Sequence, residues 1–463
     1  MIVSQGRSDT SEATTSLPVH GLLLIVALAA AVVGQGAYYA AGQWLVAGVL
    51  VAALGAALWA QRWSKADLRL AVPAACAALA AWTVLRAALA GDAAEAGPTV
   101  AVLGGLGIVL LIGRRLGRPE REALTAAMVA IGVLAALTGW VGVAWHIRPW
   151  ATIDQGLWRA ATTLTYANAA AGLLAPLALV ALAQLAARPR SALAAMTACL
   201  LLVGLGATLS RGGALALVGG AAVLVWLLGP RPILGAATAP LVGAAIALAG
   251  LVSSLPANGP ARPALAVGAL AVGLAVAAGL ARLSARARVG ALGIIAGVAV
   301  VMLLQAGPIT QAAHSIGGPR LTIVSADRAG ALGAGLRLVA EHPLTGVGPG
   351  QASFIWTTAE GRTVIGRYAH NEYLQVLVEL GVIGFLLLLV LLAAITRTVW
   401  QDRAASASPA AWAAIAAALV ALGLHSALDF LWHIPAIVLT AALLIAMATP
   451  TTLERRGNRS KHR

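Results

Sequence analysis

The chain consists mostly of long apolar runs separated by short polar stretches. A helix needs about 20 apolar residues to cross the hydrocarbon of a bilayer, and fourteen runs approach that length. The predicted spans are 20–38, 42–60, 68–90, 98–113, 122–145, 163–187, 191–209, 212–229, 233–255, 263–281, 289–306, 371–395, 409–426 and 432–449. The run 98–113 is short and the boundaries between 190 and 310 are weak. The pattern therefore predicts an all-α polytopic membrane protein with 12–14 transmembrane helices.

The polar stretches divide the chain into five parts. These are an N-terminal tail at 1–19, a transmembrane bundle at 20–306, a loop at 307–370, C-terminal transmembrane helices at 371–449 and a basic tail at 450–463. Within the loop, Leu332, Leu336 and Val339 recur at helical spacing. They predict an amphipathic helix that begins at Arg328 and lies against the bundle. It ends at His342, because a proline follows.

Composition excludes several classes of protein. Hydrophobic residues make up 60% of the chain and charged residues 10%, whereas soluble domains average about 45–50% and about 25%. A cytosolic enzyme, a disordered chain and a secreted disulfide scaffold are excluded. Cys76 and Cys199 both lie in apolar runs, which indicates small core residues rather than ligands or a disulfide. The first apolar run lacks a clear cleavage site, so we expect an uncleaved anchor.

The basic residues predict the orientation of the spans. The chain has 31 Lys and Arg against 16 Asp and Glu, a net charge of +15. With the N-terminus inside, 21 of the 31 fall on inside segments, five on short outside loops and five in the loop 307–370. Positive residues mark cytoplasmic loops, so both termini are expected in the cytoplasm and the long loop outside. Because the basic residues are scattered singly, nucleic acid is not an expected partner.

Three polar positions stand out where the spans meet the outer surface. Arg211 lies in a tight turn, where it either snorkels to headgroups or grips a phosphate with paired hydrogen bonds. Arg159 precedes Asn168, whose amide falls in the first turns of a span and needs partners. Arg328 is the first residue of the predicted loop helix. A cation at a helix N-terminus interacts unfavourably with the helix dipole, which is a weak indication that Arg328 binds an anion.

Further along, Asn371, Gln375 and Glu379 follow one another at four-residue intervals, so they share one face of a span. His370 lies at the mouth of this polar stripe and is a candidate general base. His425, Asp429 and His433 have the same spacing, but one carboxylate and two histidines across an interrupted helix are a weak metal signal. Asp429 is better interpreted as a partner for an arginine or a histidine. No metal site and no cofactor are predicted. The Gly-rich run 346–350 predicts turns, since proline interrupts it and no strand precedes it.

In order along the chain, these features resemble the motifs of the O-antigen ligase and O-antigen polymerase superfamily. The matching residues are Arg159 to Asn168, Ser-Arg-Gly-Gly at 210–213, Arg328 with His-Pro-Leu-Thr-Gly-Val-Gly-Pro-Gly at 342–350, and His-Asn-Glu-Tyr-Leu-Gln at 370–375 ending in Glu379-Leu-Gly381. The resemblance covers about residues 155–440 and is specific at 320–385. Gly333 and Gln351 depart from the aromatic residue and the Asn that are common in the family.

This resemblance implies a GT-C-like membrane glycosyltransferase. Its donor would be a glycan on undecaprenyl pyrophosphate, and transfer to an acceptor hydroxyl would be metal-independent, inverting and extracytoplasmic. Carried over by position, Arg211 and Arg328 would bind the pyrophosphate and His370 would deprotonate the acceptor. The remaining substrate-binding positions would be Arg159, Asn168, Asn371, Glu379 and Asp429. The acceptor, whether a glycan, a lipid or a protein, stays open.

An alternative from another class is a flippase or transporter of a lipid-linked glycan. Fourteen spans allow it. The polar residues, however, gather at one face rather than at the midplane, and no pair of interrupted spans repeats in the two halves.

Overall fold

The structure is a computed structural model that describes residues 17–60, 71–284, 326–358, 361–401 and 408–448, together with positions 287, 290 and 403. Its helices are α1 Val19–Val33, α2 Ala40–Ala60, α3 Ala71–Leu89, α4 Gly97–Gly113, α5 Arg118–Trp145, α6 Ala167–Ala187, α7 Ala192–Ala207, α8 Arg211–Leu228, α9 Pro230–Leu251, α10 Pro263–Arg282, α13 Ala326–Glu341, α14 Glu372–Gln401, α15 Pro409–Ser426 and α16 Pro435–Ala448. Short 3-10 turns are η1 Gln35–Ala37, η2 Ala93–Ala96, η3 Val252–Ser254 and η6 Leu431–His433.

The prediction of an all-α polytopic membrane protein is confirmed. Among the described residues, ten helices are long and apolar enough to cross a membrane, and α1, α7 and α16 are shorter apolar helices. Thirteen of the fourteen predicted spans coincide with helices. The fourteenth, 289–306, falls on residues outside the described part apart from position 290.

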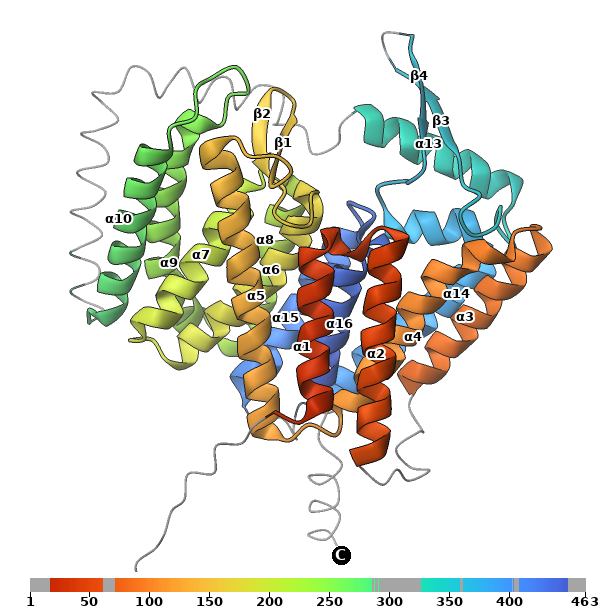
Figure 1. Ribbon diagram of the computed structural model, residues 1–463, viewed down its shortest axis with the longest axis horizontal. Helices are drawn as coiled ribbons and strands as arrows, with labels where there is room; N and C mark the ends of the chain where they lie inside the picture. The colour runs from red at the N-terminus through yellow and green to blue at the C-terminus, as the bar shows by residue number, and fades with distance from the viewer. Residues whose placement is uncertain are drawn as a thin grey trace, which may run out of the picture.

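Apart from α13, which lies across the upper end, the helices stand side by side and alternate in direction, so that consecutive connections lie at opposite ends of the bundle (Figure 1). Helix α6 is the centre, with 89% of its span buried against 22% for α2. Small residues permit the closest packing. A Cβ on either Gly243 of α9 or Gly273 of α10 would overlap the other residue's carbonyl oxygen, as expected where helices pack in lipid.

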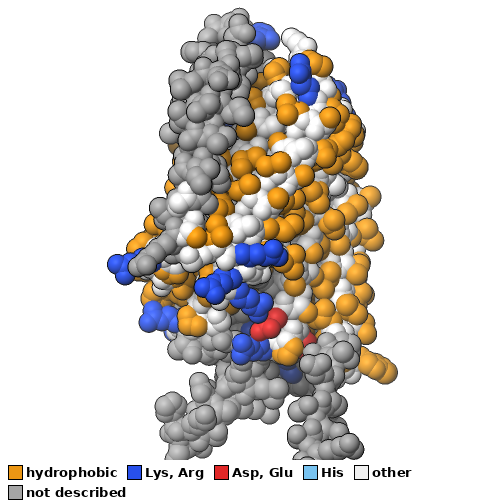
Figure 2. Space-filling model, turned by 90° about the vertical axis from the view of Figure 1, so that its left-hand side faces the viewer, with side chains coloured by type: hydrophobic (Ala, Val, Ile, Leu, Met, Phe, Trp, Pro, Cys, Tyr) orange, Lys and Arg blue, Asp and Glu red, His pale blue; other side chains and the backbone are white. Residues whose placement is uncertain are grey.

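The described arginines lie at both ends of the bundle, and the orientation of the bundle in the membrane stays a prediction. Figure 2 shows one side of the bundle as a broad apolar face on which most Lys and Arg side chains lie in the lower half. The connections at this end carry Arg114, Arg115, Arg188, Arg190 and Arg231. The expected tails at 1–19 and 450–463 fall almost wholly outside the described residues.

Two small antiparallel hairpins lie at the other, upper end (Figure 1). Strand β1 (Ala151–Asp154) pairs with β2 (Leu157–Ala160), and β3 (Phe354–Thr357) pairs with β4 (Thr363–Gly366). The predicted loop helix is confirmed as α13, which packs on β3 and on the start of α14. The first part of the loop, 307–325, is outside the described residues.

Candidate functional site

The side chain of Asp429 is the centre of a polar cluster at the upper end of the bundle. It lies between α15 and α16 and is fully buried. The Tyr166 hydroxyl lies 2.9 Å from both of its oxygens, and His370 Nδ1 lies 3.1 Å from Oδ1. Arg328 Nη2 is 3.4 Å from Oδ2, and Asn168 Nδ2 also donates to this oxygen. Three segments that are distant in sequence from one another and from Asp429 therefore converge on one carboxylate.

Arg159 enters this cluster from the hairpin β1–β2. The two strands turn at Gln155 and Gly156, which both have positive φ, of 51° and 73°, as a two-residue hairpin turn of the primed type requires. Arg159 pairs with Thr152 across the hairpin, so its side chain lies on the same face as that of Asp154. Its Nη1 lies 2.5 Å from Asp154 Oδ2. Nη2 donates to Asn168 Oδ1 at 3.0 Å. Asn168, whose amide needed partners, therefore links Arg159 to Asp429.

Arg211 is the first residue of α8. The neighbouring residues of the Ser-Arg-Gly-Gly motif at 210–213 fix the start of this helix. Ser210 caps the helix, with its hydroxyl accepting from Gly213 N at 3.2 Å. A Cβ at Gly212 would meet the His425 ring at 3.0 Å, and one at Gly213 would overlap Ala171. The two glycines thus let α8 approach α15 and α6 closely. The guanidinium interacts electrostatically with the charges of Arg328 and Arg159.

His370 and Asn371 lie at the start of α14. His370 has a φ of 51°, an uncommon conformation for a residue with a side chain. The Asn371 side chain accepts from Leu374 N at 3.1 Å and so caps the helix. The His370 side chain is 35% exposed while Asp429, its partner, is 1% exposed. The imidazole therefore has one buried, fixed side and one accessible side.

The segment 342–350 closes a break in α14, and its Gly-rich part, 346–350, forms turns, as predicted. At Gly381 the helix adopts a φ of 65° and a ψ of −171°. The break leaves backbone groups on both sides of Gly381 without a partner inside the helix, and the segment 342–350 supplies partners for them. Val347 N donates to Val378 O, and Val382 N donates to Pro343 O, both at 2.9 Å. The continuous span expected from residue 371 is consequently interrupted after Glu379.

A second polar group lies beside the first. Glu372, 1% exposed, accepts from His433 Nδ1 at 3.3 Å and from Trp432 N. Glu379 accepts from Gln375 Nε2 at 2.7 Å, so the predicted stripe exists and faces this second group rather than Asp429. Burial lowers the pKa of His433, but the charge and hydrogen bond of Glu372 and then the charge of Glu379 outweigh it and raise that pKa.

Aromatic rings separate the two groups. Phe430 stacks on Tyr368 with centroids 4.4 Å apart and on Tyr166 with centroids 5.2 Å apart. The edge of the His370 ring meets the same Phe430. Phe430 thus contacts the rings of both His370 and Tyr166 and restricts their positions around Asp429.

The charges within the first cluster set the ionisation of its members. Burial raises the pKa of Asp429, but the hydrogen bond and charge of His370, then the charge of Arg328 and the Phe430 N–H, hold it below its ordinary value. Burial, followed by the charge and hydrogen bond of Asp429, holds the pKa of Tyr166 well above its ordinary value. Asp429 is therefore an anion and Tyr166 a donor at neutral pH.

The structure brings together Arg159, Asn168, Arg211, Arg328, His370 and Asp429 of the predicted positions. Asn371 and Glu379 lie on the flanking segment of α14. Sequence reasoning missed Tyr166 and Asp154. The Gln-Gly pair at 155–156 could have indicated a hairpin turn, and with it the closeness of Asp154 to Arg159. A tyrosine that precedes a span, such as Tyr166, does not by itself indicate a functional role. Among the described residues, no group of three His, Cys, Asp or Glu side chains could hold a metal ion.

A sequence model described as O-antigen ligase matches residues 261–389 of the chain. This match supports the resemblance to the O-antigen ligase and O-antigen polymerase superfamily that was drawn from the ordered motifs, and that prediction is confirmed. The matched segment includes Arg328, the run 342–350 and His370, whereas Arg211 and Asp429 lie outside it. No curated protein matches the chain.

Proposed function

We propose that this membrane protein is a glycosyltransferase that moves a glycan from an undecaprenyl-pyrophosphate carrier to an acceptor hydroxyl. The reaction would take place on the extracytoplasmic face of the cell membrane, with both termini in the cytoplasm. One observation carries the proposal: three arginines and a His–Asp pair gather at the same end of a helix bundle whose residues 261–389 match the O-antigen ligase model.

Arginine charge would stabilise the leaving group. A departing pyrophosphate develops negative charge, and fixed arginines can stabilise it with paired hydrogen bonds in place of a metal ion. Arg211 and Arg328 are the proposed pyrophosphate ligands. Arg159 shares its charge with Asp154, so we assign it to positioning Asn168 and the turn at Thr208, whose carbonyl accepts from Nε at 2.8 Å.

His370 would act as the general base. Because Asp429 is an anion, it accepts a hydrogen bond from His370 Nδ1, which leaves Nε2 as the basic nitrogen. The acceptor oxygen would attack the anomeric carbon on the face opposite the carrier. The new carbon–oxygen bond forms as the bond to the carrier's phosphate breaks, and the electron pair leaves with undecaprenyl pyrophosphate. His370 takes the proton, and a single displacement inverts the anomeric centre.

The polar residues around this pair would hold it in place. Tyr166 and Asn168 donate to Asp429, so they orient the carboxylate that orients the histidine. Asn371 and Glu379, at the two ends of the first segment of α14, are proposed to contribute to the acceptor side. No resident cofactor enters this scheme, since the activated donor supplies the free energy.

The test is transfer by purified protein in detergent from a labelled lipid-linked glycan to candidate acceptors. We expect product from the native chain and none from Arg211→Ala, Arg328→Ala or His370→Ala. A flippase or transporter yields no product in detergent, so absence of product from the native chain with every acceptor class would favour that alternative.

Matched variants separate catalysis from folding. Arg337→Ala removes an exposed arginine from the same helix as Arg328, where it donates to Ile355 O. His342→Ala removes an exposed histidine from the same domain. Both should keep near-native turnover. If His370→Ala also keeps it, the base assignment is wrong, and if an arginine variant is inactive only because it fails to insert and fold, its role is structural.

A further inference from the structure

Helix α3 supplies a partner for one of the backbone groups that the break in α14 leaves free. The three carbonyls that precede Gly381 all accept from groups outside the helix, and the segment 342–350 pairs the first two. The third belongs to the buried residue Leu380, and it accepts from Nε1 of Trp82 on α3 at 3.0 Å. A buried carbonyl without a partner is costly, so the indole N–H helps to make the break stable.

One turn further along α3, Arg86 binds the segment that closes the break. Its Nε donates to Thr345 O at 2.7 Å, and its Nη2 donates to Gly346 O at 3.0 Å. The two preceding carbonyls, at 343 and 344, accept from backbone N–H groups of α14 just after the break. Four successive carbonyls are therefore paired, two by α14 and two by one guanidinium, whose N–H groups have a fixed planar geometry.

Helix α3, the closing segment and the break are in close contact. Helices α3 and α14 lie side by side (Figure 1). A Cβ at Gly346 would overlap the carbonyl group of Glu379, directly before the break. A Cβ at Gly384, directly after it, would meet Trp82 Nε1 at 3.2 Å. Because so closely packed a region transmits displacements, a shift of α3 or of the closing segment must move α14.

The first segment of α14, residues 372–380, carries the turn that holds His370. Gln375 lies on this segment, and its Oε1 accepts from Ala369 N at 2.8 Å. The backbone next to His370 is thus attached to the segment by a buried hydrogen bond. The 3.1 Å contact between His370 Nδ1 and Asp429 consequently depends on the direction in which the segment leaves the break.

We infer that Trp82 and Arg86 are positioning residues for the general base. They hold the backbone at the break in α14, and through its first segment they set the place of His370 against Asp429. The inference rests on the proposed function, because both residues would act on transfer only through His370. Neither side chain needs to touch the donor or the acceptor.

Amide hydrogen exchange of the purified full chain tests the hold on the break without any substrate. Trp82→Phe keeps an aromatic ring and removes the N–H, and Arg86→Ala removes both guanidinium donors. In each variant we expect peptides covering 343–348 and 372–384 to exchange about tenfold faster than in the native chain, because the break opens more often once its carbonyls lose a partner.

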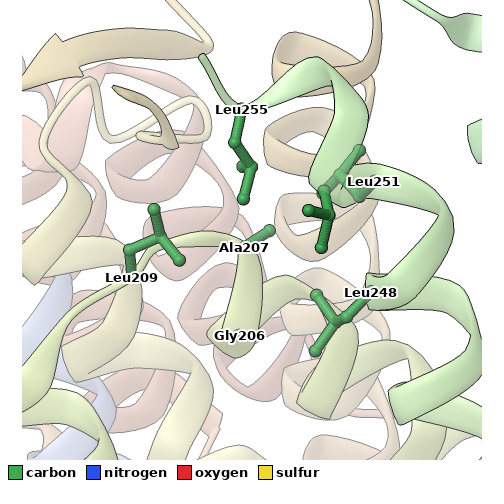
Figure 3. Close-up of a pocket in the computed structure, with 7 residues that line it drawn as sticks. Gly206, Ala207, Leu209, Leu248, Leu251 and Leu255 are labelled. Atoms are coloured by element: carbon green, nitrogen blue, oxygen red, sulfur yellow. The ribbon is translucent and has the colours of Figure 1, made fainter. Parts of the chain in front are cut away.

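Two controls separate this effect from general destabilisation. Trp44→Phe alters a 77% exposed tryptophan on α2 and should change neither peptide. Leu251→Ala enlarges an apolar pocket of about 210 Å³ between α7 and α9 (Figure 3), on the other side of the bundle from α3 (Figure 1). It should lower the melting temperature and leave exchange at the break at the native rate.

The second readout is the kinetics of transfer. In Trp82→Phe and Arg86→Ala we expect kcat to fall at least about tenfold, because small displacements of reacting groups are costly. The KM for the lipid-linked donor should stay within about threefold, since Arg211 and Arg328 are unchanged. Arg86→Lys keeps the charge without the planar pair of donors, and its kcat should lie between those of the native chain and Arg86→Ala. Arg337→Ala, which also removes an arginine bonded to a backbone carbonyl, should keep the native kcat.

Native exchange rates at the break in both α3 variants would overturn the inference, and so would faster exchange with an unchanged kcat. An equal loss of kcat in Leu251→Ala, at an equal loss of stability, would also overturn it. If the native chain transfers no glycan while the α3 variants exchange faster, the proposed function fails, and Trp82 and Arg86 keep only their role in holding the break.

Discussion

At the residue scale, Asp429 decides how His370 can function. Asp429→Asn keeps the shape of the side chain but removes the anion that accepts from His370 Nδ1 and pairs with Arg328. We expect transfer to fall by roughly 100-fold or more, because the imidazole loses both its orientation and the stabilisation of its protonated form. Turnover by purified protein at saturating donor measures the change.

The control for this variant is Glu372→Gln. It also removes a buried carboxylate bonded to a histidine, but it belongs to the second polar group. It should lower thermal stability with a much smaller effect on turnover. Equal losses of turnover in Asp429→Asn and Glu372→Gln, with equal losses of stability, would assign Asp429 a structural role only.

His433 makes stability depend on pH. Its pKa is raised above the ordinary 6.5, so the stability contributed by its pairing with Glu372 is fully present below pH 6.5 and is lost as pH rises through the folded-state pKa. We expect the melting temperature of the purified protein to fall over that alkaline range, and His433→Gln to flatten this part of the curve. His342→Gln, at an exposed position, should leave the native slope. A native slope in His433→Gln would contradict the assignment.

At the scale of elements, the break in α14 positions His370. Gly381 lies in a backbone region that is almost restricted to glycine, where another residue costs about 1–3 kcal/mol, and a Cβ there would overlap the Leu344 carbonyl oxygen. We expect Gly381→Ala to lower the melting temperature. It should also reduce turnover by at least about tenfold, because small displacements of reacting groups are costly.

Gly333→Ala is the matched substitution. Gly333 lies inside α13, and a Cβ there would meet only Arg337 Nη1, at 3.9 Å. Alanine in a helix interior is favoured by about 0.5–1 kcal/mol over glycine, so this variant should be slightly more stable and fully active. A Gly381→Ala protein as stable as Gly333→Ala would exclude the proposed role of the break.

The elements that could be predicted from the sequence are those in which apolar residues recur at helical spacing, or without interruption, over many residues. Helix α13 was predicted from three apolar positions and a following proline, and it ends within one residue of that prediction. Hairpin β1–β2 was not, because four-residue strands next to apolar spans have no distinct period. The break at Gly381 was also missed, since its cause is a distant segment, 343–348, that pairs with the exposed backbone.

At the scale of the molecule, span positions follow from the thickness of a bilayer and could be predicted, whereas the assembly of the site depends on packing. The Arg211, Arg328 and His370 motifs could each be found locally. The convergence of Arg328 and His370 on Asp429 could not, because Asp429 lies 101 and 59 residues away from them in the sequence. The convergence is produced by glycines such as Gly212 and Gly213, which set the distances between α8, α15 and α6.

The placement of all proposed catalytic residues at one end makes the orientation of the bundle the decisive property of the whole molecule. Pro189 is exposed in the connection from α6 to α7, between Arg188 and Arg190, and Asn258 is exposed in the connection from α9 to α10. These two connections lie at opposite ends of the bundle (Figure 1). Because Cys76 and Cys199 are buried, a new surface cysteine should dominate labelling. In intact cells, a membrane-impermeant maleimide should label Asn258→Cys, and label Pro189→Cys only after permeabilisation, since basic loops remain in the cytoplasm. The reverse pattern would place the arginines and His370 in the cytoplasm and would rule out transfer from a carrier presented outside.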